Sequence, residues 1–552
     1  MLKSLALKLP KVCGLLLCLL GLFAGCQKKD SFPKQEQVLR LNIPSDPETL
    51  DPRKGGDRTS SIFHCILFDG LMRLDDEGNA VQSLAEKVDI SKDRTVYTFT
   101  IRDSSWSDGS PVTAWDFEKS WKDVLDPNFP AKNAHLLYPI KNAEGAKTGI
   151  SSLSEVGIRS LNAKTLEVTL ERPTPYFLDL VAFCVLYPVN VEVDHSRPNW
   201  EYEVGSKFVS NGPFRLKEWK RNNTIVLEKN PHYYRADQVI LDEVHFSMVN
   251  SEMTAFNLFE KGELDILGNP LIPLPSDAIP QLMQERKLQV YPTGATTFCV
   301  FNVNQPPFDN ANIRKAFSYA IERKEIVSNI TQLGEEAALG AVPPVLKKYE
   351  NTAFYEDGNW TAARTHFAKG LKEMRITKEQ FPTLTFYYHT AELQHKVAQA
   401  LQEQWKSCLG VKVNLVNLEK KVLVHNLNLG NYSFALHLWI AQYKDPMNLL
   451  ERFKFPENVK NYSNWKSPQY AQLLTESSEA ITNKERYALL QQAESLLMDA
   501  MPIAPIYHWN AAFITQPHVK SYGMGSLGNG FYDRIYIEPK LNLPYEQELT
   551  KR

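Results

Sequence analysis

Residues 96–121 read VYTFTIRDSSWSDGSPVTAWDFEKSW and carry three local signals in succession. Tyr97, Phe99 and Ile101 alternate with smaller side chains, which predicts a strand with one packed face. Ser107-Asp108-Gly109 predicts a tight turn, because glycine accepts positive φ and the aspartate can hydrogen-bond nearby backbone. A helix should follow, with Thr113 as its N-cap and an acid at its third position. The stretch therefore predicts strand, turn and helix.

Length, composition and charge describe a large soluble protein. The chain has 552 residues, of which 43% are apolar and 23% charged, enough for a large core and for two or more lobes. Removing residues 1–25 would take away three lysines and no acid, so the net charge would move from −2 to −5. This balance gives no indication of nucleic-acid binding.

The N-terminus predicts a signal peptide. Three lysines precede the apolar run 12–25, which is shorter than the roughly 20 residues that a membrane-spanning helix needs. Phe23-Ala24-Gly25-Cys26 resembles a bacterial lipobox, with phenylalanine where leucine is usual. We expect residues 1–25 to be removed, Cys26 to carry lipid, 26–37 to form a tether, and the protein to be anchored to a membrane in the periplasm. An ordinary secretory peptide cut near Ala24 is the alternative.

Neither the cysteines nor the known enzyme motifs indicate catalysis. The four cysteines beyond Cys26 lack CxxC or metal spacing, and they allow three disulfide pairings or free buried thiols, so we assign no pairing. HExxH, GxSxG, P-loop and strand-linked GxGxxG patterns are absent from the sequence. His389 and His395 fall on different predicted elements, so a shared metal is not expected. We predict no catalytic residue, no metal site and no cofactor. The four cysteines are Cys65, Cys184, Cys299 and Cys408.

Beyond Phe298 helices and strands alternate. Asn310 can cap a helix whose apolar residues fall on one face. Later segments predict, in order, a helix at 361–371, a strand at 383–388, a helix at 393–408, and strands at 411–416, 434–440 and 503–509. Alternation of this kind predicts βαβ units and a mainly parallel sheet.

Several motifs resemble the family 5 extracellular solute-binding proteins, the receptors of oligopeptide and dipeptide ABC importers. The resemblance covers most of residues 38–540, and the block within 96–117 is its most specific part. The matching segments are Leu84–Glu86, Tyr97–Arg102, Trp106–Ala114, Ser45–Pro52, Ser210–Phe214, Phe301–Asp309 and Arg314–Ala316.

The resemblance implies an α/β, two-lobed, periplasmic-binding-protein type II fold with an α+β subdomain inserted in the first lobe. The ligand would be enclosed between the lobes. The expected divisions are 38–68, 188–294 and 510–552 for lobe I, 69–187 for the inserted subdomain, and 295–509 for lobe II.

The strongest candidate for ligand recognition is Phe434–Pro446. A predicted buried strand, 434–440, ends abruptly in polar residues, and ligands of open α/β sheets collect at the carboxyl ends of strands. In the resembled receptors this segment pairs main-chain groups with an extended peptide, and a carboxylate takes the α-amino group. Gln442 stands at the matching position, so the charge-assisted part of that contact would be missing. Either Asp445 supplies the missing negative charge, or the ligand presents a group other than a free N-terminus.

Other site candidates come from the same resemblance. The arginine that many peptide receptors carry before the tryptophan is replaced by Leu436. The loop at Gly55-Gly56-Asp57 could face the ligand or simply turn the chain. The full set of predicted ligand-binding residues is Gly56, Asp57, Phe298, His437, Trp439, Ile440, Gln442, Tyr443, Asp445 and Trp509.

We therefore expect a binding protein that captures oligopeptides, performs no catalysis and hands its ligand to ABC importer permease subunits. We expect it to act as a monomer. Within the same family, receptors for murein peptides, nickel, haem or sugars are alternatives. In other classes, a lipoprotein hydrolase or a chaperone on this fold remains open.

Overall fold

The structure is a computed structural model that describes residues 36–350, 352–456, 458, 460–528 and 530–539. The chain divides into two units, Met1–Glu36 and Gln37–Arg552, and every element below belongs to the second. The predicted signal peptide, Cys26 and all but the last two residues of the predicted tether lie outside the described residues. Within the described part of the chain, no helix has the length and apolar character that a bilayer crossing requires.

A four-stranded sheet opens the second unit, with strand order β1-β10-β9-β8. The first strand pairs in parallel with β10, and the other two pairings are antiparallel. Helix α1 packs on this sheet, with the rings of Phe63 and Phe246 4.8 Å apart. The bounds are β1 (Val38–Ile43), α1 (Arg58–Leu67), β8 (Phe214–Lys220), β9 (Thr224–Lys229) and β10 (Glu243–Met248).

The segment expected as an insert forms a separate antiparallel sheet, in the order β4-β5-β7-β6. Its second strand is Val96–Ile101, and its buried residues are those predicted from the alternation. Gly109 takes φ +89° in the turn that follows. Thr113 then begins a capping box, its N–H donating to Asp116 Oδ2 at 2.8 Å. The predicted strand, turn and helix are therefore confirmed. The bounds are β4 (Ala85–Ile90), β5 (Val96–Ile101), α2 (Ala114–Val124), η1 (Ala134–Leu137), α3 (Ala143–Lys147), β6 (Ile158–Asn162), β7 (Thr165–Thr169), α4 (Phe177–Val181) and α5 (Val191–Ser196).

A buried arginine ties the opening segment to this inserted sheet's helices. Arg53 lies between three carboxylates, those of Asp51, Asp123 and Asp194, at 2.8, 2.9 and 2.6 Å. A buried cation is stable only when such partners replace its water, so this cluster joins β1's outgoing loop to α2 and α5.

The largest sheet has seven strands, in the order β11-β17-β12-β16-β14-β15 with β13 beside β17. Only the pairings of β14 with β15 and with β16 are parallel. The prediction of a mainly parallel sheet is therefore wrong. The βαβ crossovers exist only where α11 and α12 connect these three strands, whereas β12 and β17 join the sheet from outside that alternation. The bounds are β11 (Ile266–Gly268), β12 (Gln289–Phe301), β13 (Glu336–Ala337), β14 (Leu384–His389), β15 (Val413–Leu418), β16 (Phe434–Ile440) and β17 (Ile503–Thr515).

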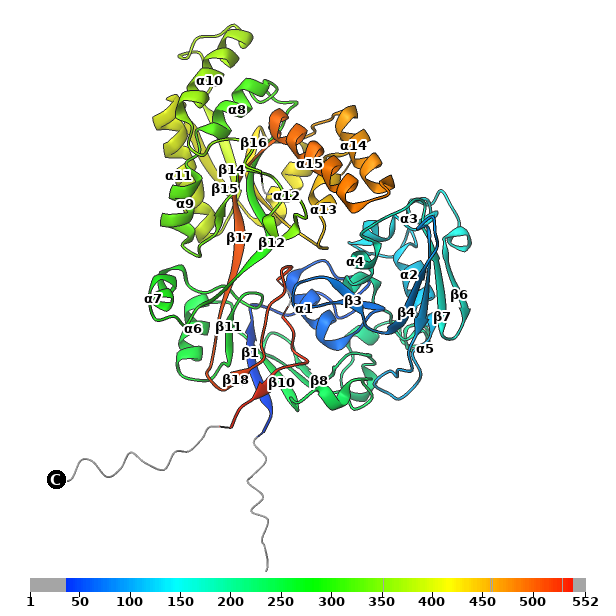
Figure 1. The fold of residues 1–552 in the computed structure, drawn as a ribbon. Coiled ribbons are helices and arrows are strands. Elements are labelled where there is room, and N and C mark those ends of the chain that lie inside the picture. Colours follow the sequence, from blue (N-terminus) through cyan, green and yellow to red (C-terminus); the bar gives the residue numbers. More distant parts are fainter. Residues whose placement is uncertain (1–35, 351, 457, 459, 529, 540–552) are drawn as a thin grey trace, which may run out of the picture. The chain divides into compact units, whose positions relative to one another are not determined.

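Helices cover both faces of that sheet, as Figure 1 shows. Phe301 and Phe434 on one face pack with α8, α10 and α11. Val300 and Ala435 belong to the core on the other face, to which α12, α14 and α15 contribute. The bounds are α6 (Glu252–Glu260), α7 (Ile279–Gln284), α8 (Ala311–Tyr319), α9 (Arg323–Ile326), α10 (Trp360–Met374), α11 (Glu392–Leu409), α12 (Lys420–Leu429), α13 (Met447–Leu450), α14 (Pro468–Glu479) and α15 (Asn483–Ala500).

Strands β12 and β17 are long, with 13 residues each, and they pair along most of their length. Their register breaks between Pro292 and Thr296 and again between Thr297 and Phe298. Before the first break β12 pairs only with β17, and after it also with β16. The neighbouring strands thus change midway along both β12 and β17, whereas the pairing of these two strands with each other continues.

Two small two-stranded sheets complete the description of the described residues. The hairpin β2–β3 precedes the inserted sheet, and β18 pairs with β19 near the C-terminus. The bounds are β2 (Met72–Leu74), β3 (Ala80–Gln82), β18 (Val519–Lys520) and β19 (Tyr536–Ile537).

Candidate ligand-binding site

Strand β16 presents an open edge. It pairs with β12 from Phe434 to Ile440, whereas β14 pairs with it only at Phe434 and Ala435. No strand among the described residues pairs with 437–440 on that second side. Main-chain groups on an open edge are free to pair with an added strand. The strand spans 434–440 as predicted.

Gln442 lies just past this edge and contacts the inserted segment. Its Nε2 donates to Asn133 Oδ1 at 2.9 Å, and its Oε1 is 3.3 Å from His135 Nε2. Both partners belong to the turn around η1, far away in sequence. Burial lowers the pKa of His135 to about 3, and nearby Lys460 acts in the same direction, so the imidazole is uncharged at neutral pH. The side chains that meet Gln442 here are neutral amide and imidazole groups.

Two cations lie beside this contact. Lys460 Nζ is 3.4 Å from His135 Nε2, and burial lowers the pKa of that ammonium to about 8. Arg452 lies over the ring of Trp439, with its guanidinium carbon 5.2 Å from the ring centre. Burial lowers the pKa of Arg452 to about 10. Both cations are therefore incompletely compensated by neighbouring charges.

Tyr443 follows β16 and packs against the inserted segment. Its ring stacks on Tyr176, with centres 5.0 Å apart and planes 8° apart, and its hydroxyl donates to Glu451 Oε1 at 2.9 Å. Burial raises the pKa of Glu451 to about 7. This carboxyl is therefore only partly ionised near neutral pH.

Asp445 is held by an arginine. Its two carboxylate oxygens accept from Arg486 at 2.7 and 2.9 Å, and Met447 N–H donates to one of them at 2.9 Å. Both side chains of the pair are buried, at 6% and 3% exposed. The strongest acceptor positions of this carboxylate are thus already used inside the protein.

Four further predicted residues lie on β16 or on β12 and β17 beside it. Phe298 is buried, and its ring meets that of His437 edge-on at 5.9 Å. Burial lowers the pKa of His437 to about 3. Ile440 is 44% exposed at the open edge. Trp509 donates from Nε1 to Thr297 Oγ1 at 2.7 Å.

Gly56 and Asp57 have a different environment. The carboxylate of Asp57 caps α1 by accepting from Ser60 N–H at 2.9 Å. A side chain on Gly56 would come within 2.4 Å of Lys132 Cδ. Asn133 nevertheless connects this loop to the end of β16, because it donates to Gly55 O at 2.9 Å and accepts from Gln442 Nε2 at 2.9 Å. A role of Gly56 and Asp57 in ligand binding stays a prediction.

The residues that sequence reasoning missed are Asn133, His135, Arg452 and Lys460. They lie in short turns without periodic pattern, and the first two are about 300 residues from Gln442. The only sequence signal for them was the presence of an arginine and a lysine soon after the predicted strand 434–440.

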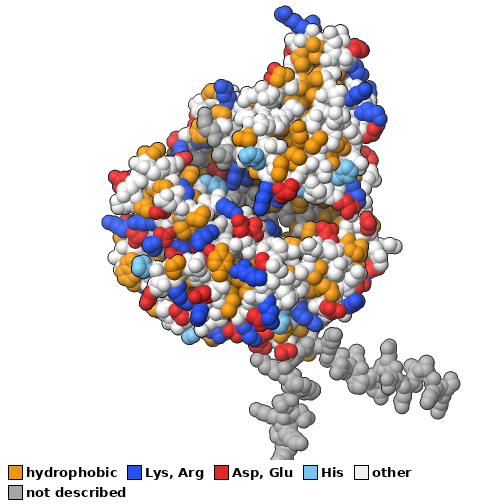
Figure 2. Space-filling model, turned by 180° about the vertical axis from the view of Figure 1, so that it is seen from behind, with side chains coloured by type: hydrophobic (Ala, Val, Ile, Leu, Met, Phe, Trp, Pro, Cys, Tyr) orange, Lys and Arg blue, Asp and Glu red, His pale blue; other side chains and the backbone are white. Residues whose placement is uncertain are grey.

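Figure 2 shows acidic and basic side chains meeting along a recess that separates the upper and lower parts of the face seen from behind. Lys and Arg side chains are prominent there.

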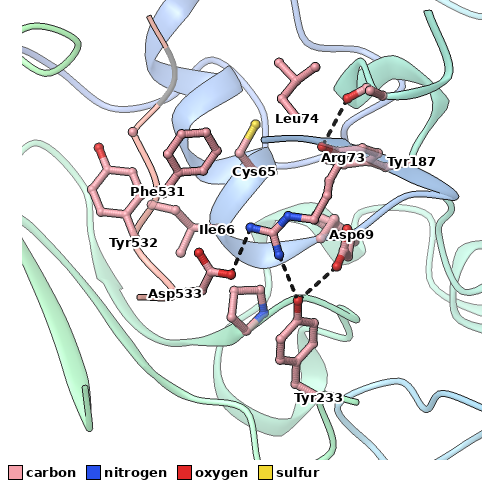
Figure 3. Close-up of a pocket in the computed structure, with 14 residues that line it drawn as sticks. Cys65, Ile66, Asp69, Arg73, Leu74, Tyr187, Tyr233, Phe531, Tyr532 and Asp533 are labelled. Carbon is pink, nitrogen blue, oxygen red and sulfur yellow. Dashed lines mark hydrogen bonds and ion pairs between the residues drawn. The ribbon is translucent and has the colours of Figure 1, made fainter. Parts of the chain in front are cut away.

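A small cavity lies elsewhere, between α1 and the segment 530–533 (Figure 3). Its volume is about 50 Å³, whereas ligand pockets usually hold about 300–1,000 Å³. Arg73 bridges it, with an ion pair to Asp533 at 2.9 Å and a hydrogen bond to Tyr233 at 3.4 Å. Tyr233 in turn donates to Asp69 at 3.0 Å. The cavity suits a few water molecules at most, and its charges hold the C-terminal segment in place.

The remaining predictions concern thiols and metals. Cys65, Cys184, Cys299 and Cys408 are all free thiols, three of them buried. In the part of the chain that the structure covers, no group of three or more His, Cys, Asp or Glu side chains is placed to hold a metal ion.

Comparison with known proteins places the chain in a family. Residues 79–461 match the sequence model of the bacterial extracellular solute-binding proteins, family 5 Middle. The oligopeptide-binding protein OppA of Bacillus subtilis is 38% identical over 518 residues, covering 93% of this chain and 95% of the relative. The murein peptide-binding protein MppA of Escherichia coli is 30% identical, covering 91% of this chain and 94% of the relative.

Solved structures give the same result. The Escherichia coli murein tripeptide binding protein MppA superposes with a TM-score of 0.79 at 28% identity, covering 91% of this chain and 99% of that one. Haemophilus influenzae OppA in complex with RPPGFSPFR gives a TM-score of 0.79 at 25% identity, with 92% and 99% covered. The expected α/β, two-lobed type II fold is therefore confirmed. The chain belongs to the family 5 bacterial extracellular solute-binding proteins.

Proposed function

We propose that this protein captures oligopeptides between its two lobes, outside the cytoplasm, and delivers them unchanged to the permease of an ABC importer. The observation that carries the proposal is the open edge of β16 at 437–440, which ends beside side chains from the inserted segment. An extended peptide can pair with that edge through main-chain hydrogen bonds. These bonds do not depend on the side chains of the peptide. The relatives OppA of Bacillus subtilis and of Haemophilus influenzae, named as oligopeptide-binding and solved with a bound peptide respectively, support the same reading.

Capture would proceed by hinge closure. We place the lobe boundaries at 294/295 and 509/510, beside the register breaks in β12 and β17. The contacts of Gln442 with Asn133 and His135 would form when lobe II meets the inserted subdomain of lobe I. Opening would break these two polar contacts and expose the strand edge.

The cellular setting is part of the proposal. Residues 1–25 would direct export, and lipid on Cys26 would anchor the mature protein to a membrane. The protein would act as a monomer and present its closed form to the permease. It would need no cofactor and perform no catalysis.

Calorimetry on the full chain in detergent tests the proposal. Tri- to pentapeptides that differ only in side chains should bind with similar affinities, because recognition is through the main chain. Methylating one central amide nitrogen should weaken binding by about tenfold, since it removes one main-chain donor. Failure of every peptide to bind, or equal binding of the methylated peptide, would contradict the proposal.

A murein peptide is the second candidate ligand, because MppA of Escherichia coli covers nearly the whole chain with a TM-score of 0.79. The same titration with a murein tripeptide separates it from ordinary oligopeptides. Mass analysis of the recovered ligand also tests for a hydrolase, which would return a cleaved product. Preference for an unfolded protein over short peptides would instead indicate a chaperone.

A further inference from the structure

We propose that Arg452 and Lys460 form a carboxylate-binding subsite beside Gln442, so that this receptor favours peptides that bring a negative charge to that end of the cleft. The inference rests on the proposed capture of peptides and specifies their charge. The shared chemistry is a carboxylate, whether it comes from an acidic side chain or from the C-terminus of the peptide.

The first support is a guanidinium without a partner. In the described part of the chain Arg452 makes no hydrogen bond and no ion pair; its guanidinium lies over the face of Trp439 at 5.2 Å, and the carboxyl of Glu451 acts on it only from beyond ion-pair distance. Protein surrounds the group closely enough to lower its pKa, yet the side chain remains partly reached by solvent. An arginine desolvated without a counter-ion is costly, and a bound carboxylate would satisfy it through two parallel hydrogen bonds.

The second support is a buried donor at the same place. Trp439 is 1% exposed, and its Nε1–H has no hydrogen-bond partner among the described residues. Buried polar groups in native proteins nearly always have partners, so this donor is available to an acceptor on a ligand. Since the indole lies against Arg452, one acceptor could serve both donors.

The third support is the ammonium of Lys460. Its recorded contact is with His135 Nε2 at 3.4 Å, and that imidazole is uncharged because burial holds its pKa far below neutral. Among the described residues no carboxylate forms an ion pair with this ammonium, and Glu451 acts on it only from a longer distance. It adds a second positive charge near Gln442.

The nearby carboxylates do not cancel these charges. Asp445 is bound through both oxygens to Arg486. Glu451 accepts from Tyr443, and burial raises its pKa to about 7, so it carries only part of a charge. Gln442 itself supplies none. A free ammonium on the ligand would thus meet net positive surroundings, whereas a carboxylate would meet unpaired donors.

Paired peptides test the inference on the wild-type full chain by calorimetry. We expect a tripeptide with glutamate near Gln442 to bind at least about tenfold more tightly than the same peptide with glutamine. This is the affinity that one charge-assisted hydrogen bond adds. A parallel pair, with a free or an amidated C-terminus, identifies which carboxylate is used. Equal affinities within both pairs would overturn the inference while leaving the peptide-binding function intact. If no peptide binds at all, both fail together.

Matched variants locate the subsite. Arg452→Gln and Lys460→Gln should each bring the acidic-to-neutral affinity ratio toward one. Lys396→Gln removes one charge from an exposed position on α11, where the side chain is 42% exposed, and should leave the ratio unchanged. An unaltered ratio in both cleft variants would assign the preference elsewhere and overturn the inference. Since the peptide pairs also discriminate in the wild-type protein, the test survives a variant that fails to fold.

Discussion

Asp445 and Arg486 form a doubly hydrogen-bonded ion pair, 2.7 and 2.9 Å long, that joins the loop after β16 to α15. Both side chains are almost fully buried. The pair therefore contributes to the position of the recognition loop, and a ligand ammonium would have to compete with a guanidinium for the same oxygens.

Breaking that pair should destabilise the protein. We expect Asp445→Asn to lower the free energy of unfolding by about 3–5 kcal/mol, because Arg486 is left as an uncompensated buried charge. Guanidinium chloride unfolding measures the loss. Glu392→Gln, which removes the exposed ion pair with Lys396 at 2.7 Å, is the control and should cost under about 1 kcal/mol. A similar cost for both variants would contradict the structural role of Asp445.

Glu451 should make stability depend on pH. Burial raises its pKa from 4.5 to about 7, so the folded protein holds a proton that the unfolded chain has released. The free energy of unfolding should therefore fall as pH rises from about 4.5 to about 7, by on the order of 3 kcal/mol, and then level off. Glu451→Gln keeps an acceptor for Tyr443 but cannot ionise. Urea unfolding at pH 5 and pH 7.5 should show a smaller pH dependence in this variant than in wild type.

Replacing Gln442 by aspartate should change the preferred ligand. A carboxylate there would attract a free α-amino group and would also neutralise Lys460 nearby. We expect Gln442→Asp to raise the affinity for a free peptide relative to its N-acetylated form by about tenfold. Calorimetry with the two peptides measures the ratio, and Gln442→Asn serves as the uncharged control. The idea fails if aspartate and asparagine give the same ratio.

Two adjacent residues of the C-terminal segment differ sharply in the burial of their ion pairs. Asp533 pairs with Arg73 at sites 12% and 15% exposed, whereas Arg534 pairs with Asp76 at sites 44% and 71% exposed. We expect Asp533→Asn to cost about 3 kcal/mol and to speed hydrogen exchange of amides at 530–537. Arg534→Gln should cost under about 1 kcal/mol. Equal exchange rates in the two variants would show that the cavity does not anchor the segment.

The thiols should resist alkylation in the folded protein. Cys184, Cys299 and Cys408 are buried, and burial raises the pKa of the partly exposed Cys65 to about 11, so little reactive thiolate is present. Iodoacetamide at pH 8, followed by peptide mass analysis, should leave these four unmodified until denaturant is added. Rapid modification of Cys65 alone would contradict its placement.

Much of the fold was predictable because local rules decided it. Gly109 required positive φ, Thr113 and Asp116 formed a capping box, and the apolar run at 434–440 became one strand with those bounds. In each case the deciding partners lie within a few residues. The length of β17 was missed: the strand was expected to end at Trp509 and continues to Thr515, since its second half finds partners in β11 and β12.

The polar side of the site depended on distant partners and was not predictable. On α15 the charged residues Arg486 and Glu494 are buried beside the apolar ones. Their partners come from other segments: Arg486 binds Asp445, and Glu494 accepts from Val342 N–H and from the Tyr349 hydroxyl. From sequence alone a charged residue is predicted to be exposed, because the partner that would allow its burial is not known. The neighbours of Gln442 from η1 were missed for the same reason.

The pairing of β17 with β11 and β12 also sets a sequence of events during synthesis. Ile266 and Gln289 are made more than 200 residues before their partners Thr515 and Phe513. Because such non-local pairing must wait for β17, β11 and the first part of β12 cannot complete their sheet while they leave the ribosome. This part of the sheet therefore has to form after the intervening helices and strands have been synthesised.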